Sequence, residues 1–294
     1  MKISVFGLFR DSESTIHESL KRLDDLHEID DCDFEFFFYE NDSVDNTRSI
    51  LNEWVKERDA IFFYEDINAP KYGSVTNEER LMLLSYYRNK LKSMAGNLTS
   101  DFSLLLDTDI VFSNKHVSIL LDELRWNPNR VMVTANTRQV EIPDVLFGET
   151  SDSYYDVFAC RDYYNNDCFY FANCPLILED DRNKWNNNIP VTVSSAFGGL
   201  AVVSNLAFNY SKWSTNGHSE HVNFCKEVSR FGEICIVPSC TPRAVIDINT
   251  VSKEIISRAQ VIQKKRLAYC NSLFKNSVSF IMELEQNKKD SKNE

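Results

Sequence analysis

Two aspartates separated by a threonine, Asp107 and Asp109, interrupt an apolar run in the stretch SLLLDTDIVF. An unpaired carboxylate in a buried strand costs so much free energy that it takes up a proton instead. Either the strand ends at Asp107 and leaves both acids in water, or a positive group lies against them. In extended chain, residues two apart project to the same side, so both carboxylates can face one cation. Mg²⁺ and Mn²⁺ prefer oxygen ligands and often combine one or two carboxylates with substrate phosphates. The motif therefore predicts a divalent-cation site, and the alternative is a solvated turn that contains two acids.

A second polar group follows the apolar stretch FEFFFY. Glu40 and Asp42 come directly after this predicted strand, where acids and amides can hydrogen-bond the base and ribose of a nucleoside. The alternative is that Asp42, Asp45 and Asn46 form the turn and cap the next helix, which residues of these types do well. Both interpretations can hold for different residues.

Cations and glycines also occur at informative places. Arg88 lies in the helix predicted before the DTD strand, and Arg10 follows the first predicted strand. A chain with a formal net charge of -12 needs such side chains near the phosphates of a ligand. A solvated helix face is the alternative for Arg88. Gly198 and Gly199 separate two apolar segments, and glycine suits either a loop that touches a ligand or a tight turn.

Two further acidic segments could contact a sugar or a metal. Asp156 and Asp162 belong to YYDVFACRD, where aromatic faces can stack on a sugar while carboxylates accept hydrogen bonds from its hydroxyls. An ordinary buried element is the alternative. In the stretch HSEH, His221 could supply a third metal contact, and Glu220 could act as a base or hydrogen-bond an acceptor. A lone surface histidine is the alternative there.

The first 110 residues alternate between strand-like and helix-like patterns that would position these side chains. We expect strands at 2–9, 34–39, 60–64 and 102–106, and helices that begin near 12, 46 and 78. This alternation predicts right-handed crossovers and a mostly parallel sheet flanked by helices, hence an α/β fold. The ligand crevice of such a sheet lies beyond the carboxyl ends of its strands. We therefore expect Gly7, Phe9 and Arg10 to lie close to the two aspartates.

The pattern loosens after Asp109. A strand is expected at 131–135, and strands at 190–193 and 199–203 flank a turn at Phe197-Gly198-Gly199. The aromatic and polar stretch 154–188 suits long loops over a site. From about residue 251 a basic helical pattern begins, and we expect it to pack on the domain or on a second copy as a dimer contact. Its residues Lys264, Lys265 and Arg266 could also contact a membrane surface.

Bulk composition excludes several classes of protein. The 294 residues, 43% of them hydrophobic, suffice for a substantial core. The net charge of -12 argues against a partner that is a nucleic acid. The eight cysteines contain no CxxC pair, so we expect reduced thiols. The N-terminal apolar run is too short for a signal peptide or anchor, and no stretch approaches the roughly 20 apolar residues of a transmembrane span. We therefore expect a cytoplasmic protein.

The segments ENDSVDNT, YYRNKL, LLLDTDIVF, YYDVFACRD and SEHVNF occur in this order within about residues 3–225. Their order resembles GT-A type glycosyltransferases, and more narrowly the family of cryptococcal α-1,3-mannosyltransferases and capsule-associated proteins. The glycine segment departs from that family, since Ala196-Phe197-Gly198 stands where a Cys-Trp-Asn type sequence is typical. The resemblance implies a Rossmann-like GT-A fold, Mn²⁺ or Mg²⁺, and retaining transfer of a sugar such as mannose from a nucleotide-diphosphate sugar to a glycan hydroxyl.

The resemblance also implies roles for residues and segments. Asp107 and Asp109 would hold the metal and the ribose or diphosphate, Glu40 and Asp42 would contact the nucleoside, and Arg88 would stabilise the pocket or the phosphates. We assign 1–250 to the transferase domain, with a nucleotide-binding half (1–110) and an acceptor-binding half (111–250), and 251–294 to a helical extension with a disordered tail.

Two other functions stay open at this point. A haloacid-dehalogenase-type phosphatase also places DxD after a strand, with the first aspartate as nucleophile. There the motif normally opens the fold, whereas here a long α/β pattern precedes Asp107. The second alternative, from a different class, is a catalytically inactive module that binds a nucleotide sugar or a glycan.

Overall fold

The computed structural model describes residues 1–72, 77–139, 153–169 and 173–244. The strands in these ranges are β1 (Lys2–Phe9), β2 (Asp33–Asn41), β3 (Ala60–Glu65), β4 (Phe102–Asp107), β5 (Ile110–Val111), β6 (Arg130–Ala135), β7 (Arg138–Gln139), β8 (Ser153–Tyr154), β9 (Val191–Val193), β10 (Leu200–Ser204), β11 (Glu233–Val237) and β12 (Arg243–Ala244). The α-helices are α1 (Ile16–Asp24), α2 (Thr47–Trp54), α3 (Glu78–Ala95), α4 (Asn114–Arg125), α5 (Glu179–Asn186), α6 (Asn205–Tyr210) and α7 (Glu220–Val228).

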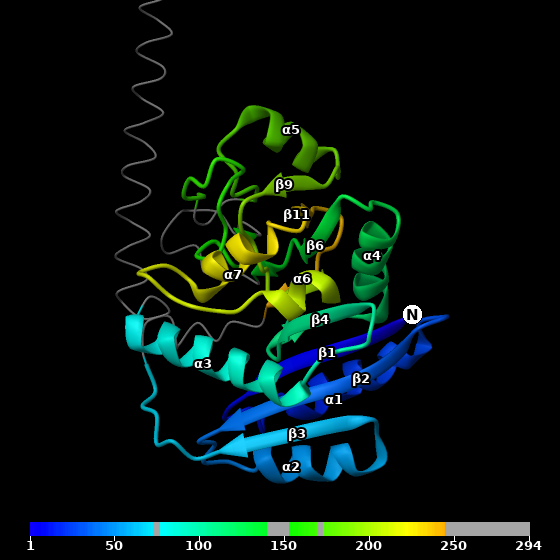
Figure 1. Cartoon of the computed structure of the whole chain (residues 1–294), viewed down its shortest axis with the longest axis vertical. Helices are drawn as coiled ribbons and strands as arrows, with labels where there is room; N and C mark the ends of the chain where they lie inside the picture. The colour runs from blue at the N-terminus through cyan, green and yellow to red at the C-terminus, as the bar shows by residue number, and fades with distance from the viewer. Residues whose placement is uncertain (73–76, 140–152, 170–172, 245–294) are drawn as a thin grey trace, which may run out of the picture. The chain divides into compact units, whose positions relative to one another are not determined.

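The described strands form one large sheet and one small one. The large sheet has the order β3-β2-β1-β4-β10-β6-β11-β9, which Figure 1 shows from β3 at the bottom to β9 at the top. Strands β1 to β4 pair in parallel, whereas β10 runs antiparallel between β4 and β6. The small sheet has the order β5-β12-β7-β8. The mostly parallel sheet predicted from the sequence is therefore confirmed.

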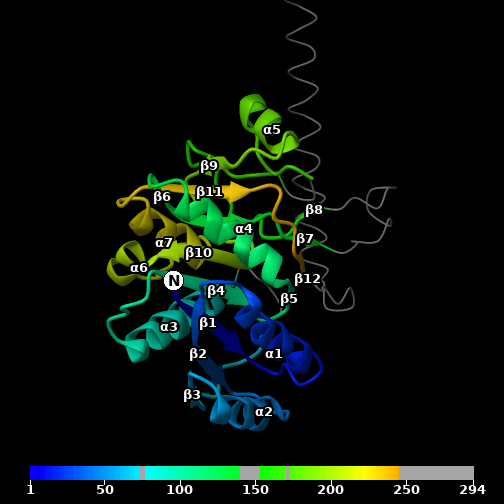
Figure 2. The ribbon, with the colours of Figure 1, turned by 90° about the vertical axis from the view of Figure 1, so that its right-hand side faces the viewer.

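Helices cover both faces of the large sheet. Figure 2 shows α3, α6 and α7 on one side of the strands and α1, α2 and α4 on the other. The stretch FEFFFY of β2 serves both layers because alternate residues of a strand point to opposite faces. Phe36 and Phe38 pack with α1, α2 and α4, and Phe37 and Tyr39 pack with α3, α6 and α7. This double burial explains why the run is apolar almost throughout.

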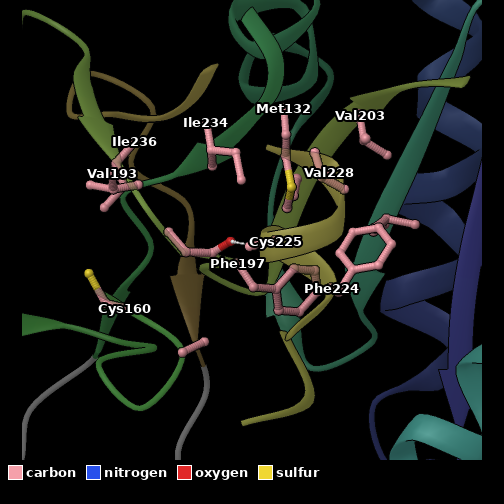
Figure 3. Close-up of a cluster of buried hydrophobic side chains, with 14 of the residues drawn as sticks. Met132, Cys160, Val193, Phe197, Val203, Phe224, Cys225, Val228, Ile234 and Ile236 are labelled. Atoms are coloured by element: carbon pink, nitrogen blue, oxygen red, sulfur yellow. Dashed lines mark hydrogen bonds between the residues drawn. The ribbon is translucent and has the colours of Figure 1, made fainter. Parts of the chain in front are cut away.

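Part of the core supports the turn before β10. Figure 3 shows Phe224 and Cys225 of α7 among apolar side chains of β6, β9, β10 and β11, with Phe197 beside them. The Cys225 thiol donates a hydrogen bond of 3.4 Å to the Ala196 carbonyl. Buried side chains of the core therefore support the segment that precedes the glycine turn. The described cysteines are all free thiols, as expected.

Most predicted elements of the first 110 residues are present, with bounds that shift by a residue or two, except that α1 begins at Ile16, four residues later than expected. Helix α3 begins after Asn77, whose side chain accepts a hydrogen bond from the Arg80 N–H at 2.9 Å, and it ends at Gly96. The prediction of long loops across 154–188 was wrong at its end, where α5 forms. Helices α4 and α7 were not predicted. The predicted extension at 251–294 lies outside the described residues, and the division into domains stays a prediction.

None of the described helices combines the length and apolarity that crossing a membrane requires.

Candidate active site

A cleft of about 580 Å³ opens at the carboxyl ends of β1, β2 and β4. This is the edge where the register pairs Phe9 with Glu40 and Leu8 with Asp107. Side chains at these strand ends line the cleft together with α3 and Tyr155. The predicted site residues among them are Phe9, Arg10, Asp107 and Asp109. The sheet thus brings together residues that are about a hundred positions apart in the sequence.

Asp107 and Asp109 reach the cleft from a turn, and the extended conformation predicted for DTD was wrong. Strand β4 ends at Asp107, and Thr108 and Asp109 form a turn before β5. The Thr108 hydroxyl donates to the Leu8 carbonyl at 3.1 Å, and the Ser19 hydroxyl donates to the Thr108 carbonyl at 2.7 Å. These bonds tie the turn to β1 and α1, so both carboxylates line the cleft although the backbone is not extended.

A positive group also lies against the first aspartate. The Arg88 Nη2 is 3.1 Å from Asp107 Oδ1, and its Nε is 3.3 Å from Glu220 Oε1. The Arg88 side chain is only 10% exposed, and its guanidinium lies over the Phe197 ring at 5.2 Å. Burial, two carboxylate partners and a ring contact fix this arginine between α3 and α7. Both conditions inferred for the acids, a strand end and a cation, therefore hold for Asp107.

Two carboxylates in and beside the cleft have raised pKa values. Burial by surrounding protein atoms, followed by repulsion from Asp107, raises the pKa of Asp109 to about 7, although Arg80, which also lines the cleft, acts in the opposite direction. Burial, followed by the charges of Asp107 and Glu220, raises the pKa of Asp156 to about 7 as well. Asp156 Oδ2 accepts a hydrogen bond of 3.2 Å from the Gly198 N–H. Burial is the larger cause in both cases, so these pKa values report the enclosure of the two acids more than the charges around them.

The residues present fit a divalent cation that takes only part of its ligands from the protein. Asp107 and Asp109 both line the cleft, and solvent reaches the Asp109 side chain from it. Within the described ranges, no three His, Cys, Asp or Glu side chains converge as a metal-binding group. Two carboxylates completed by oxygens of a bound phosphate are the arrangement that Mg²⁺ usually adopts.

The glycine pair holds the backbone of the site. Gly198 and Gly199 form the predicted turn with φ values of +66° and +69°, which residues with a side chain rarely adopt. The Gly199 carbonyl accepts a 2.8 Å hydrogen bond from the Asp107 N–H. Among the described residues that line the cleft, neither glycine occurs, and Gly7 of β1 is also absent. These three glycines were predicted to bind the donor, and they lie behind the residues that line the cleft. Their contact with the donor stays a prediction.

Glu40 and Asp42 are bonded within the protein. Glu40 is fully buried; it accepts a hydrogen bond from the Ser43 N–H at 2.7 Å and pairs with Arg48 at 2.5 Å. Asp42 accepts hydrogen bonds from the N–H groups of residues 67, 68 and 69 at 2.8 to 3.0 Å. Neither is among the described lining residues, and Asn41 between them is. Asp42 therefore shapes the loop that follows β3 rather than capping α2, while Asp45 accepts a hydrogen bond of 3.0 Å from the Thr47 N–H at the start of that helix. The predicted contact of Glu40 and Asp42 with a nucleoside stays a prediction.

His221 is buried behind the site. Its ring stacks on Phe197 with centroids 3.9 Å apart, and its Nδ1 accepts a hydrogen bond of 3.4 Å from the Trp213 indole N–H. Burial lowers its pKa well below the ordinary value, so the ring is neutral. With Nδ1 as acceptor, the proton of a neutral ring lies on Nε2, which is 3.4 Å from Glu220 Oε1. Nε2 makes no hydrogen bond with Glu220 at this distance, and the predicted role of His221 as a metal ligand stays a prediction.

Asp162 lies in a loop of its own. It is fully buried, and its carboxylate accepts hydrogen bonds from the backbone N–H and the side-chain amide of Asn166 at 2.8 and 3.0 Å. It does not occur among the described residues of the cleft. Glu220 and Asp156 are not among the described lining residues either, but Arg88 links Glu220 to Asp107, and the charges of Asp107 and Glu220 act on Asp156. Asp162 has no such link among the described contacts.

Several cleft residues were not predicted from the sequence. Tyr87 lines the cleft from α3, next to the predicted Arg88, and its hydroxyl accepts from the Asn41 amide at 3.2 Å. Lys71 and Tyr72 come from the loop after β3. Tyr155 belongs to the quoted YYD segment, whose aromatic character was the available signal. The loop after β3 carries no motif, so the sequence offered no comparable signal for Lys71 and Tyr72.

The sheet, its flanking helices and the acidic turn at the end of β4 define a GT-A type glycosyltransferase, as the resemblance implied. The model of the family described as cryptococcal mannosyltransferase 1 matches residues 30–239. The chain belongs to this family. No curated protein sequence matches the chain.

Solved structures of three other proteins are similar at low sequence identity. S. aureus TarS 1–349 is 14% identical with a TM-score of 0.48, over 83% of this chain and 60% of that chain. The mannosyltransferase PcManGT from Pyrobaculum calidifontis, in complex with GDP-Man and Mn²⁺, is 12% identical with a TM-score of 0.48, over 83% and 57%. Glucosyl-3-phosphoglycerate synthase from Mycobacterium tuberculosis is 14% identical with a TM-score of 0.49, over 90% and 78%. The chain thus spans about 60% of the length of the first two.

Proposed function

We propose that this chain transfers a sugar, mannose by its family, from a nucleotide-diphosphate sugar to a hydroxyl of a glycan, with Mn²⁺ or Mg²⁺ as cofactor. One observation carries the proposal. The cleft of about 580 Å³ at the carboxyl ends of β1, β2 and β4 presents both aspartates of the DTD turn. Open α/β sheets bind their ligands at this edge, and the acidic pair there supplies the oxygen ligands that a hard cation needs.

Different residues of the cleft would bind the cation and the nucleoside of the donor. Asp107 and Asp109 would hold the cation, which supplies electrostatic stabilisation for the negative charge that develops on the departing nucleotide. Arg88 keeps Asp107 in place through the contact of 3.1 Å and carries no proton that it can lose near neutral pH. Phe9, Arg10 and Tyr87 lie on the nucleoside side of the cleft, where β1 and β2 end.

Two carboxylates are candidates for the acceptor side of the reaction. Glu220 is tied to Asp107 through Arg88, and Asp156 lies close enough to both acids for their charges to raise its pKa. Either could accept the proton of the attacking hydroxyl or orient that hydroxyl. We keep retention of the anomeric configuration as part of the proposal. Proton NMR of the freshly formed glycosidic bond would distinguish retention from inversion.

Binding of donor and metal can be tested without knowing the acceptor. We expect UDP-, GDP- or dTDP-sugars to raise the melting temperature only when Mn²⁺ is present, because a ligand that binds only the native state stabilises it by mass action. At a ligand concentration of 100 times Kd the gain is about 2.7 kcal/mol. Asp109→Asn should stay folded and lose the Mn²⁺-dependent shift. A full shift in that variant, or a shift that survives chelation, would contradict the metal role.

The alternative of a binding module without catalysis predicts the same thermal shift. Slow release of free sugar from the preferred donor, in Mn²⁺ and without acceptor, separates the two, since only a catalytic site hydrolyses the donor. The phosphatase alternative requires Asp107 to attack phosphorus, although its Oδ1 is held by Arg88. Mass spectrometry for a phosphorylated Asp107 after incubation with phosphate esters tests it directly.

A further inference from the structure

Two buried cysteines lie against each other in the segment between β8 and α5, and we call Cys160 and Cys168 the thiol pair. The Cys168 thiol donates a hydrogen bond of 3.2 Å to the Cys160 Sγ. Cys160 is fully buried, Cys168 is 5% exposed, and both belong to the core cluster of which Figure 3 shows a part. Among the described cysteines, no other two thiols are joined by a hydrogen bond. The two sulfur atoms are thus specific neighbours.

The backbone places the thiol pair on facing positions of two antiparallel segments. Arg161 and Asp167 form an antiparallel bridge, so the next positions outward on the two segments are Cys160 and Cys168. Facing residues of an antiparallel pair have Cα atoms about 4.5–5.5 Å apart. A disulfide needs Cα atoms about 4.4–6.8 Å apart. The spacing of the two segments therefore suits a disulfide.

The directions of the side chains agree with this register. Successive side chains of an extended segment point to opposite sides. Arg161 and Asp167 form an ion pair of 3.1 Å, and the Asp167 side chain is 83% exposed. The thiol pair, one position further out, faces the core instead. Both thiols therefore point to the same side, which a disulfide between them requires.

Hydrogen bonds connect the surroundings of the thiol pair to the segment that precedes the glycine turn. The Arg161 N–H donates to the Ser195 carbonyl at 2.8 Å, and the Ser195 hydroxyl donates to the Ala159 carbonyl at 2.7 Å. The Ser194 N–H donates to the Asp162 carbonyl at 3.2 Å. A covalent bond between the two cysteines would therefore also brace the backbone that leads into the glycine turn.

We propose that Cys160 and Cys168 are the site of a structural disulfide, which forms while the chain folds in the presence of an oxidised thiol. The two thiols together lose two electrons and two protons, and a bond forms between their sulfur atoms. Glutathione disulfide takes up these electrons and protons and is reduced to two molecules of glutathione. The bond forms whether or not the chain transfers a sugar.

The burial of the thiol pair determines when the bond can form. The hydrogen bond with Cys168, followed by burial, raises the pKa of Cys160 well above its usual value. Because the thiolate is the form that attacks a disulfide, the folded and reduced chain should react slowly. Oxidation is therefore expected during folding, while both thiols are still accessible.

Cell-free synthesis of the full chain tests the site during folding itself. One reaction contains reduced and oxidised glutathione, and the other contains dithiothreitol. Free thiols are alkylated in denaturant, and the chain is digested with trypsin and chymotrypsin, which cleave between Cys160 and Cys168 and between Cys168 and Cys174. Mass spectrometry should detect a cross-link of Cys160 to Cys168, with six of the eight thiols alkylated, in the glutathione reaction only.

Urea denaturation measures what the bond contributes to stability. The disulfide would close a loop of nine residues, so the folding equilibrium constant should rise on the order of 100-fold over that of the reduced chain. Cys160→Ala should abolish both the cross-link and this gain. Cys235→Ala is the matched control, since Cys235 is also fully buried and its described partner is the Thr192 hydroxyl at 3.7 Å. The control should keep both.

Three results would overturn the proposal. They are a parent chain without the cross-link in the glutathione reaction, a cross-link of Cys168 to Cys174 instead, and a cross-link that leaves the folding constant unchanged. Should Cys160→Ala fail to fold, Cys168→Ala provides the same comparison from the other side of the bond.

Discussion

At the scale of single residues, the buried contacts of His221 lead us to propose a role other than the predicted metal contact. Trp213 fixes Nδ1 as acceptor, so the ring proton lies on Nε2, which is 3.4 Å from Glu220 Oε1 without a hydrogen bond between them. The partial positive charge of this N–H still favours a carboxylate beside it. We therefore describe His221 as a positioning residue for Glu220.

Substituting His221→Phe tests this assignment, because the stacking on Phe197 is kept while both ring nitrogens are lost. Donor hydrolysis should fall by at most about tenfold in kcat, because the contact with Glu220 is weaker than a full hydrogen bond, with little change in the KM of the donor. The Mn²⁺ concentration that gives half of the maximal rate should stay unchanged. A large increase in that concentration would instead show that His221 is a metal ligand.

At the scale of elements, the turn between Phe197 and β10 determines where Asp107 lies. A Cβ at Gly199 would lie 2.7 Å from Ile110 Cγ1 and 3.3 Å from Tyr155 Cε1, and its φ of +69° strains any other residue. Gly96 after α3 offers a matched control, since its φ is +72° and nothing lies within 4 Å of a Cβ there. Substitution by alanine strains the backbone at both positions, and only at Gly199 does the added Cβ also crowd its neighbours.

We expect Gly199→Ala to lower the free energy of unfolding by about 2–4 kcal/mol, from strain and overpacking together. Gly96→Ala, with a φ of 72° and a ψ of -155° in a region nearly restricted to glycine, should lose about 1–3 kcal/mol from strain alone. Urea denaturation measures both values. Donor hydrolysis should fall in Gly199→Ala alone, because its carbonyl accepts the Asp107 N–H. Similar losses of stability in the two variants would contradict the packing argument.

The elements also show what the sequence could predict. Strands β1, β2 and β4 are mostly buried and pair in parallel, so they read as continuous apolar runs whose ends place Asp107, Phe9 and Arg10 correctly. Helix α5 has the sequence EDDRNKWN with only Asp181 and Trp185 buried, which leaves no apolar period to detect. Lys71 and Tyr72 enter the cleft through a loop held by Asp42. Such tertiary hydrogen bonds leave no periodic trace in the sequence.

At the scale of the whole molecule, the described lining of the cleft comes entirely from residues 8–155. A chain that ends at residue 250 should therefore keep the Mn²⁺-dependent thermal shift with the preferred donor. Light scattering and liposome sedimentation of the full chain and of the chain that ends at residue 250 would test the predicted dimer or membrane contact of 251–294. Loss of the donor shift in the shorter chain would show that the extension contributes to the site.

The reversed direction of β10 has a practical consequence for altering this protein. Its amino end enters from the edge where the parallel neighbours finish, and its carboxyl end leaves at the opposite edge. Residues inserted before Leu200 would therefore intrude on the reaction centre, whereas residues inserted at the exposed Gly96 and Asn97, ahead of β4, would emerge on the far side. A reporter peptide or an affinity tag between α3 and β4 is the one that should leave turnover intact.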